Sequence, residues 1–227
     1  MTSNLSNHKS KYFLIPYIGA AIIGVSIIPF AYTTLKSFIS PSNYIQSSND
    51  LWAAGNYKAA LDAVNTAIKL DSKNPQLYID RAQVREKLGD EQGALQDCNK
   101  AIELDPKSSI AYAVRAKFRS KLGDNQGALQ DSNIAIKLAP EFYGGYSNRG
   151  FARRNLGDTE GYLQDFNKAI QLNAKNPTAH YNRAWVRYDL GDNQGAIKDW
   201  QQAANLYLQQ GDTKEYLEAI EKIKLIQ

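Results

Sequence analysis

The chain has 227 residues, enough for one ordinary domain or two small ones, and its formal net charge is +4. Residues 1–40 hold three lysines and no acidic residue, so the rest of the chain is nearly neutral. It lacks the basic surface of a nucleic-acid-binding protein, and nucleic acid is not an expected partner. The single cysteine, Cys98, excludes an intramolecular disulfide.

The chain begins with a short tail, residues 1–11, followed by an uncharged apolar segment, residues 12–35. As a helix this segment would span roughly 36 Å, which exceeds the roughly 30 Å of a hydrocarbon core. We interpret it as an uncleaved single-pass transmembrane anchor. A cleaved signal peptide is the main alternative, but its apolar region is normally shorter and no Ala-x-Ala site follows. A buried soluble helix fits less well, because the segment is apolar on all sides.

Charges beside this segment bear on its orientation. Lys9 and Lys11 precede it and Lys36 follows it, so the positive-inside bias predicts a cytoplasmic N-terminus with the rest of the chain on the non-cytoplasmic side. Ala20 and Gly24 form a small-xxx-small pair that suits either helix dimerisation or plain contact with lipid.

After the apolar segment, the sequence repeats itself every 34 residues. The clearest marker is a glycine column, four of whose members stand in a Leu-Gly-Asp motif: Gly55, Gly89, Gly123, Gly157 and Gly191. A fixed period in this range indicates one supersecondary unit that is copied and stacked. The predicted units, with a final amphipathic helix that covers the end of the stack, are 41–74, 75–108, 109–142, 143–176, 177–210 and 211–227.

Each unit is predicted to be a helix, a turn and a second helix. The glycine suits a left-handed helix C-terminus, and the aspartate after it can cap the second helix. Proline opens the units at residues 41, 75 and 177, as it does in first helical turns. An all-alanine column in the second helices would let paired helices approach closely: Ala67, Ala101, Ala135, Ala169 and Ala203.

These columns resemble a tetratricopeptide repeat. The fourth unit carries the signature best, with Arg149-Gly150, then Leu156-Gly157-Asp158, then Ala169. The resemblance covers residues 41–210 and implies an all-α superhelix, an α-solenoid with a groove for protein recognition. In this family the groove is lined mainly by the exposed face of each first helix.

Two arginine columns and one aspartate column run through the units. A cation ladder for an acidic ligand is one interpretation, and structural Arg–Asp pairing between the two helices of a unit is the favoured one. The first unit lacks all three charges, having Ser47, Leu51 and Ala63 instead, as pairing predicts, although a capping role for the first unit would also explain their absence. The columns are Arg81/115/149/183, Arg85/119/153/187 and Asp97/131/165/199.

No catalytic, cofactor-binding or metal-binding constellation is predicted. The only histidines are His8 and His180, and the latter shares a column with tyrosines, which indicates a packing role. Cys98 shares a column with apolar and small residues and has no base beside it. The chain is therefore not expected to be an enzyme.

Carried onto this sequence, the family resemblance predicts a partner-binding groove. Aromatic residues can anchor an interface, and basic residues make the middle of the groove suited to an acidic protein or peptide segment. The aromatic residues of the fifth unit equally suit packing against the final helix. The predicted groove residues are Trp52, Lys87, Lys117, Lys121, Phe151, Arg154, Tyr181, Trp185 and Tyr188.

The sequence thus predicts a membrane-anchored, non-catalytic scaffold for protein–protein interaction. Repeats of this type resemble those abundant in photosynthetic bacteria, so an assembly factor for a membrane complex, including a photosynthetic one, is a more specific alternative. A structural module that associates with itself is another.

Overall fold

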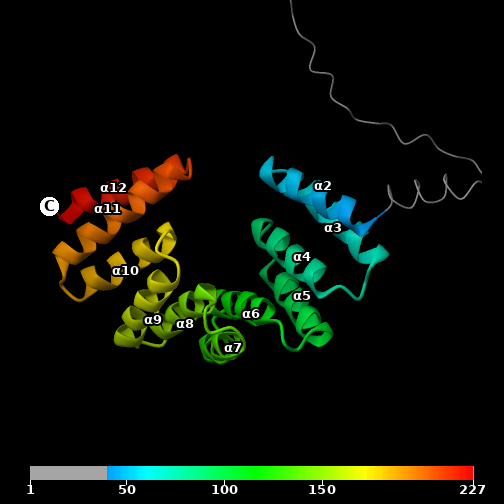
Figure 1. Cartoon of the computed structure of the whole chain (residues 1–227), viewed down its shortest axis with the longest axis horizontal. Helices are drawn as coiled ribbons and strands as arrows, with labels where there is room; N and C mark the ends of the chain where they lie inside the picture. Colours follow the sequence, from blue (N-terminus) through cyan, green and yellow to red (C-terminus); the bar gives the residue numbers. More distant parts are fainter. Residues whose placement is uncertain (1–39, 227) are drawn as a thin grey trace, which may run out of the picture. The chain divides into compact units, whose positions relative to one another are not determined.

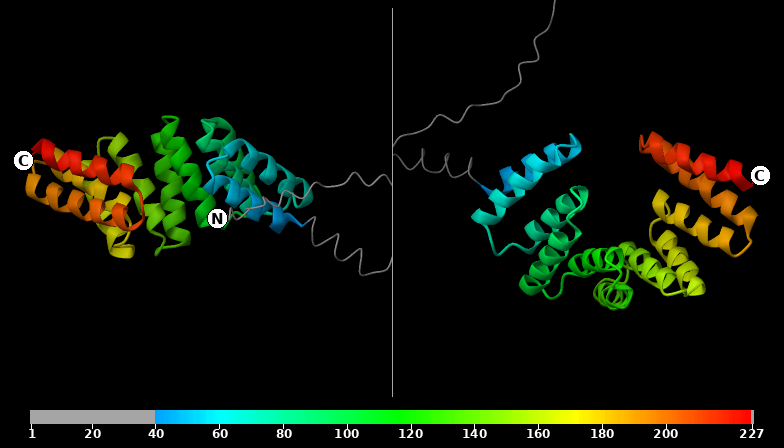
Figure 2. Two further views of the ribbon diagram at one scale, coloured as in Figure 1. Left: turned by 90° about the horizontal axis from the view of Figure 1, so that it is seen from above. Right: turned by 180° about the vertical axis from the view of Figure 1, so that it is seen from behind.

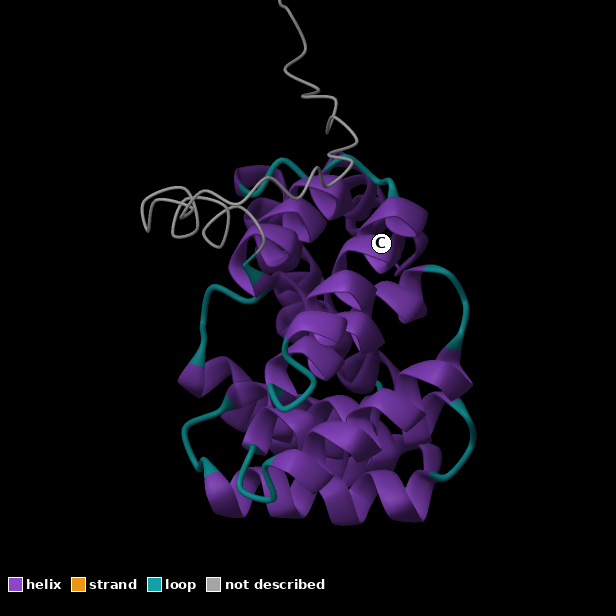
Figure 3. Ribbon diagram, turned by 90° about the vertical axis from the view of Figure 1, so that its right-hand side faces the viewer, coloured by secondary structure: helices purple, strands orange, loops and turns teal. Residues whose placement is uncertain are grey.

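The structure, a computed structural model, describes residues 40–226. In this part of the chain every regular element is an α-helix, and the helices are joined by short loops (Figure 3). The predicted all-α solenoid is confirmed. In chain order the helices are α2 (Pro41–Ala53), α3 (Tyr57–Leu70), α4 (Pro75–Lys87), α5 (Glu91–Leu104), α6 (Ser109–Lys121), α7 (Asn125–Leu138), α8 (Tyr143–Asn155), α9 (Thr159–Leu172), α10 (Pro177–Asp189), α11 (Asn193–Gln209) and α12 (Thr213–Ile226).

The predicted N-terminal tail, residues 1–11, and the predicted membrane anchor, residues 12–35, lie outside the described residues. Between residues 40 and 226, no helix has both the length and the apolar character that crossing a membrane requires.

Consecutive helices form five pairs, from α2/α3 to α10/α11, and α12 packs on α11. The pairs follow one another along a curved row from α2 to α12 (Figures 1 and 2). Each predicted 34-residue unit contains one pair, and the segment 211–227 contains α12. This arrangement brings the first helices of neighbouring pairs together, as α6 and α8 do.

Glycines with positive φ make the turns between paired helices. All five glycines of the column have φ between 74° and 88°, a region that disfavours residues with a Cβ. Gly211 repeats this geometry with φ 78° between α11 and α12. The following aspartates cap the second helices, as in Asp90, whose Oδ1 accepts from the Gly93 N–H at 2.8 Å. The predicted turn and cap roles are confirmed.

The alanine column of the second helices is fully buried, as expected for close helix approach. In the fourth pair Tyr162 and Phe166 are buried at positions where the second pair has Ala94 and Cys98. Gly150 accommodates them, since a Cβ at this position would lie 2.8 Å from Phe166 Cε2.

The arginine and aspartate columns form ion pairs within the second to fifth helix pairs, which confirms the favoured hypothesis. Asp165 is buried and accepts from Arg149 Nη2 at 2.6 Å and from Arg153 Nη1 at 2.9 Å. Arg153 Nη1 also donates to the Gly161 carbonyl at 3.2 Å. The same pattern recurs around Asp97, Asp131 and Asp199.

A further contact of the arginines, which the sequence analysis did not predict, links neighbouring pairs. Nη1 of the first arginine in each set donates to an asparagine one pair earlier, at 2.9 to 3.0 Å. The arginine–asparagine contacts are Arg81–Asn65, Arg115–Asn99, Arg149–Asn133 and Arg183–Asn167. The guanidinium of each such arginine therefore links the two helices of its own pair and also contacts the preceding helix pair.

Candidate protein-binding groove

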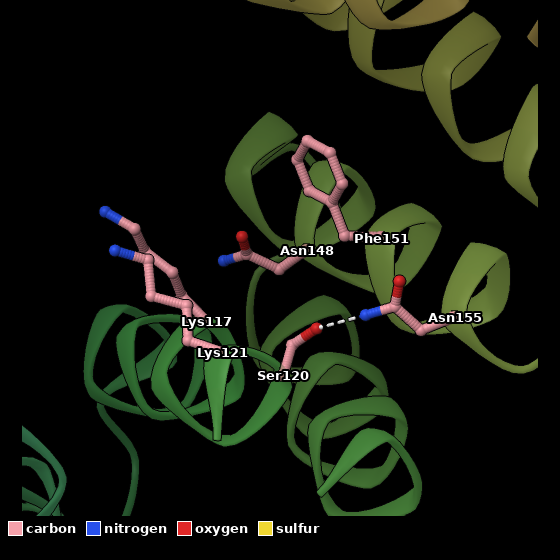
Figure 4. A pocket seen from close by; sticks show the side chains of 6 residues that line it. All are labelled: Lys117, Ser120, Lys121, Asn148, Phe151 and Asn155. Carbon is pink, nitrogen blue, oxygen red and sulfur yellow. Dashed lines mark hydrogen bonds between the residues drawn. The ribbon is translucent and has the colours of Figure 1, made fainter. Parts of the chain in front are cut away.

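A pocket of about 360 Å³ lies between the first helices α6 and α8. Figure 4 shows the six side chains that line it, three from each helix: Lys117, Ser120, Lys121, Asn148, Phe151 and Asn155. Three of them, Lys117, Lys121 and Phe151, are predicted groove residues. We call this hollow the α6/α8 pocket.

Two asparagines give the α6/α8 pocket its polar wall. Asn148 Nδ2 donates to the Ala113 carbonyl at 2.8 Å, and Asn155 Nδ2 donates to Ser120 Oγ at 3.0 Å. Their carboxamide oxygens point to the same side as the Phe151 ring (Figure 4). These oxygens are placed to accept hydrogen bonds from the backbone N–H groups of an extended segment.

The Phe151 ring is held by other aromatic rings. Its centroid lies 5.4 Å from that of Phe166 and 6.3 Å from that of Tyr162. Arg154 lies over the Tyr162 ring at 5.9 Å, so this predicted groove residue covers the aromatic cluster. Burial raises the pKa of Tyr162 to about 12, so its hydroxyl stays neutral. The cluster gives Phe151 a fixed, partly exposed face.

Lys117 and Lys121 carry the positive charge of the pocket, and both contact Glu86 of α4. Lys117 Nζ lies 2.7 Å and Lys121 Nζ 2.5 Å from a Glu86 carboxylate oxygen. Burial raises the pKa of Glu86, but the hydrogen bonds and charges of both lysines outweigh this effect, and the pKa is lowered. Glu86 is thus a carboxylate at neutral pH, and the groove is less basic than the sequence analysis predicts.

A second hollow of about 190 Å³ lies between α2 and α4 and has Trp52 in its wall. Several of its residues stand 68 residues, or two repeats, before those of the α6/α8 pocket, as Asn49 does before Lys117 and Asp80 before Asn148. Lys87 Nζ lies 5.6 Å from the centroid of the Trp52 ring, a cation–π contact. The repeat therefore places hollows at equivalent positions between α2 and α4 and between α6 and α8, but different side chains line them.

The aromatic residues of α10 meet α12 instead of lying fully open. The Tyr181 hydroxyl donates to Glu218 Oε1 at 2.6 Å, and Trp185 packs with Trp200 in a cluster that includes Ile223. Lys222 Nζ lies 5.3 Å from the Trp185 ring centroid. Burial and the bond to Glu218 raise the pKa of Tyr181. These contacts favour packing against the final helix for Tyr181 and Trp185.

Tyr188 differs from its two neighbours, because 40 % of its surface is exposed. It lines a hollow of about 140 Å³ together with Trp185 and residues of α12. Of the three aromatic residues that α10 contributes to the predicted groove, Tyr188 is the one most available to a partner.

The polar residues Ser120, Asn148 and Asn155 were missed by the sequence analysis, and so was the pairing of Glu86. A signal existed for each. Asn148 stands two repeats after Asp80, and Ser120 stands in the same repeat position as Glu86 and Arg154, so all face the same side of a first helix. Because asparagine and serine are common on exposed helix faces, their residue types alone did not select them.

Chemically reactive groups in the described part of the chain have structural roles. His180 Nε2 lies 3.0 Å from the Ala174 carbonyl oxygen. One repeat earlier, the hydroxyl of Tyr146 makes the equivalent contact by donating to the Pro140 carbonyl. Burial raises the pKa of Cys98 to about 12, which keeps the thiol protonated and unreactive. Among residues 40–226, no group of three His, Cys, Asp or Glu side chains could hold a metal ion.

Comparison with known families gives two matches, both described as tetratricopeptide repeat, over residues 51–119 and 152–206. Together they cover more than half of the chain. The chain belongs to the tetratricopeptide-repeat family. A search of curated proteins found no match.

Solved tetratricopeptide-repeat structures share the fold. A thermophilic protein of Thermus thermophilus is 20 % identical with a TM-score of 0.72, over 80 % of this chain and 99 % of that one. MamA from Desulfovibrio magneticus is 19 % identical with a TM-score of 0.59, over 75 % and 96 %. YrrB, described as having an unusual peptide-binding site, is 18 % identical with a TM-score of 0.53, over 86 % and 98 %. At these identities the likeness establishes the fold alone.

Proposed function

We propose that the protein is a non-catalytic scaffold that binds a protein or peptide segment across the first helices of its repeats. The observation that carries the proposal is the α6/α8 pocket, which combines a fixed aromatic face, two outward carboxamide oxygens and two lysines. These groups suit an apolar side chain, a peptide backbone and an acidic side chain respectively. Tetratricopeptide-repeat proteins are typically non-catalytic scaffolds, which agrees with this proposal.

The 34-residue units 41–74 to 177–210 are proposed as the functional repeats, with 211–227 as the helix that covers the last one. Within this scheme, two further sets of predicted groove residues flank the α6/α8 pocket along the chain. Trp52 and Lys87 precede it, and Trp185 and Tyr188 follow it. A partner longer than a few residues would contact these side chains as well as the α6/α8 pocket.

We further propose that residues 12–35 anchor the scaffold in a membrane as a single span, with the repeats on the non-cytoplasmic side. The support is the uncharged length of this segment and the lysines beside it. Anchoring would confine the search for partners to two dimensions and suits an assembly factor for a membrane complex, the more specific variant. Extraction of membranes with alkaline carbonate tests the anchor, because release of the chain into the supernatant would contradict it.

Peptide binding by groove variants tests the scaffold proposal directly. The full chain, in detergent, would be used to select binders from a random peptide library, and the selected peptides measured against Phe151→Ala. Leu208→Ala is the matched control, because Leu208 is 55 % exposed on the second helix α11. We expect about tenfold weaker binding for the Phe151 variant and no change for the control. Equal binding by both would contradict a site in this groove.

Self-association is the competing function, with Ala20 and Gly24 of the apolar segment as its motif. Both residues lie outside the described part of the chain. The molar mass of the detergent-solubilised protein, measured by light scattering, separates the two functions. A stable oligomer that recruits no partner would favour the structural module over the scaffold.

A further inference from the structure

The two lysines of the α6/α8 pocket already have a carboxylate partner within the chain. Glu86 belongs to α4 and reaches across to α6, where it pairs with both Lys117 and Lys121. The lysine side chains are 45 % and 42 % exposed, whereas that of Glu86 is 15 % exposed. The lysines line the pocket and are therefore partly accessible to solvent while they contact Glu86.

We propose that Glu86 is an internal competitor for the ligand, holding in the free protein the two lysines that pair with a carboxylate of the bound partner. An acidic segment would then enter the α6/α8 pocket by taking Lys117 and Lys121 away from Glu86. This inference rests on the function proposed above and names the chemistry of the partner at this pocket.

The ion pairs with Glu86 are of a kind that is readily exchanged. Partly exposed ion pairs between long side chains contribute little net stability, because the side chains lose entropy and water competes for the charges. Each ammonium group stands on a flexible stem with three donors, so it can turn from one acceptor to another. Lys117 and Lys121 are four residues apart on α6, which puts both on one helix face and lets them move together.

The charge balance of the pocket favours a carboxylate over other ligands. Two ammonium groups share one internal carboxylate, so a net positive charge remains on the lysine side of the pocket. A basic segment would be repelled, and a neutral one would gain no compensation for disturbing the pairs. Glu86 therefore raises selectivity by making the lysines available only to a segment that can replace its charge.

The geometry around the lysines adds a second feature to the partner. The Phe151 ring and the Asn148 oxygen lie across the pocket from the lysines (Figure 4). A segment whose carboxylate reaches Lys117 would bring its neighbouring residues over Phe151. We infer that the preferred partner carries an acidic residue followed or preceded closely by an apolar one.

The test compares Glu86→Gln with the double variant Lys117→Gln/Lys121→Gln, both in the full detergent-solubilised chain. A random peptide library is selected on each protein, and the affinity of individual peptides is measured by fluorescence anisotropy. We expect peptides selected on the parent to be rich in Asp and Glu, to bind Glu86→Gln about 3- to 10-fold more tightly, and to lose binding to the double variant.

The outcomes separate this inference from the proposed function. If Glu86→Gln binds acidic peptides no better than the parent while the double variant loses them, the pocket binds peptides but Glu86 is only a structural link, and the inference fails. Selected peptides without acidic residues would overturn it too. If no protein yields peptides that depend on Phe151 or the lysines, the proposed function itself fails.

Discussion

Replacing Asp165 by alanine should destabilise the repeat stack substantially. The carboxylate is 2 % exposed and accepts four hydrogen bonds: three from Arg149 at 2.6 to 3.1 Å and one from Arg153 at 2.9 Å. Removing one partner of a buried ion pair typically costs about 3–5 kcal/mol, because a charge is left without compensation. Here the arginine side chains keep 19 % and 26 % exposure, so water can solvate them in part. We therefore expect a loss of about 2–3 kcal/mol.

Urea unfolding followed by circular dichroism measures this loss through the midpoint and slope of the transition. Asp165→Asn should fall between the parent and alanine, since it keeps one acceptor oxygen but loses the charge. Glu103→Ala is the control, because Glu103 also pairs with a cation, Lys100 at 2.7 Å, but at the surface. Binding of groove peptides should be retained below the transition. An alanine variant that unfolds at the same urea concentration as the parent would refute the structural role of the arginine–aspartate columns.

Three further predictions concern a helix cap, the thiol and the response to acid. Gly161→Ala should destabilise the protein by about 1 kcal/mol, although alanine has the higher helix propensity. The Cβ of the new alanine would occupy the space of the Asp158 carboxylate, which caps α9. Urea unfolding that shows a stabilised variant would contradict this prediction. Cys98 should react with Ellman's reagent only in unfolding concentrations of urea, since it is buried and its pKa is raised to about 12; rapid labelling of the native protein would be the contrary result. Burial raises the pKa of Asp199, but Arg183, His180 and Arg187 lower it more, so the pKa is lower in the folded protein than in the unfolded chain. The ion pairs of Asp199 therefore contribute their full stability above the unfolded-state pKa of about 3.9. This contribution is lost as the pH falls through the lower folded-state pKa. The stability difference between the parent and Asp199→Asn should therefore shrink as the pH is lowered below about 4, and a difference that stays constant down to about pH 2 would contradict the assignment.

The repeat sequence predicts the fold of this protein because each position recurs several times. A single Gly-Asp pair would be weak evidence for a turn, whereas Gly89-Asp90 and its copies at a constant spacing fix both the turn and the helix that follows. The same repetition shows that the arginines and aspartates disappear together from the first unit. Coordinated absence in one chain thus carries information that usually requires many related sequences.

The proposed binding surface is less predictable, because it depends on residues that do not repeat. Lys117 and Lys121 look like free cations in the sequence, yet both pair with Glu86, which stands 31 and 35 residues earlier. The contact arises from the approach of α4 and α6, and no periodic pattern reports which side chains meet there. Likewise, Tyr181 and Trp185 look like open aromatic residues because the sequence does not say where α12 lies against α10.

The arginine–asparagine contacts explain why the two ends of the stack differ. Each junction takes an asparagine from the second helix of one pair and an arginine from the first helix of the next, as in Asn65 with Arg81. The first pair precedes every junction, so it needs only the acceptor, and Ser47 can stand where later pairs have arginine. The last pair has Arg183 for the junction behind it but Gln201 in the asparagine column, and α12 follows it instead of another repeat. The arginine–asparagine contact always joins the second helix of one pair to the first helix of the next. It therefore accounts for the missing arginine in the first repeat and the missing asparagine in the last repeat, without reference to a ligand.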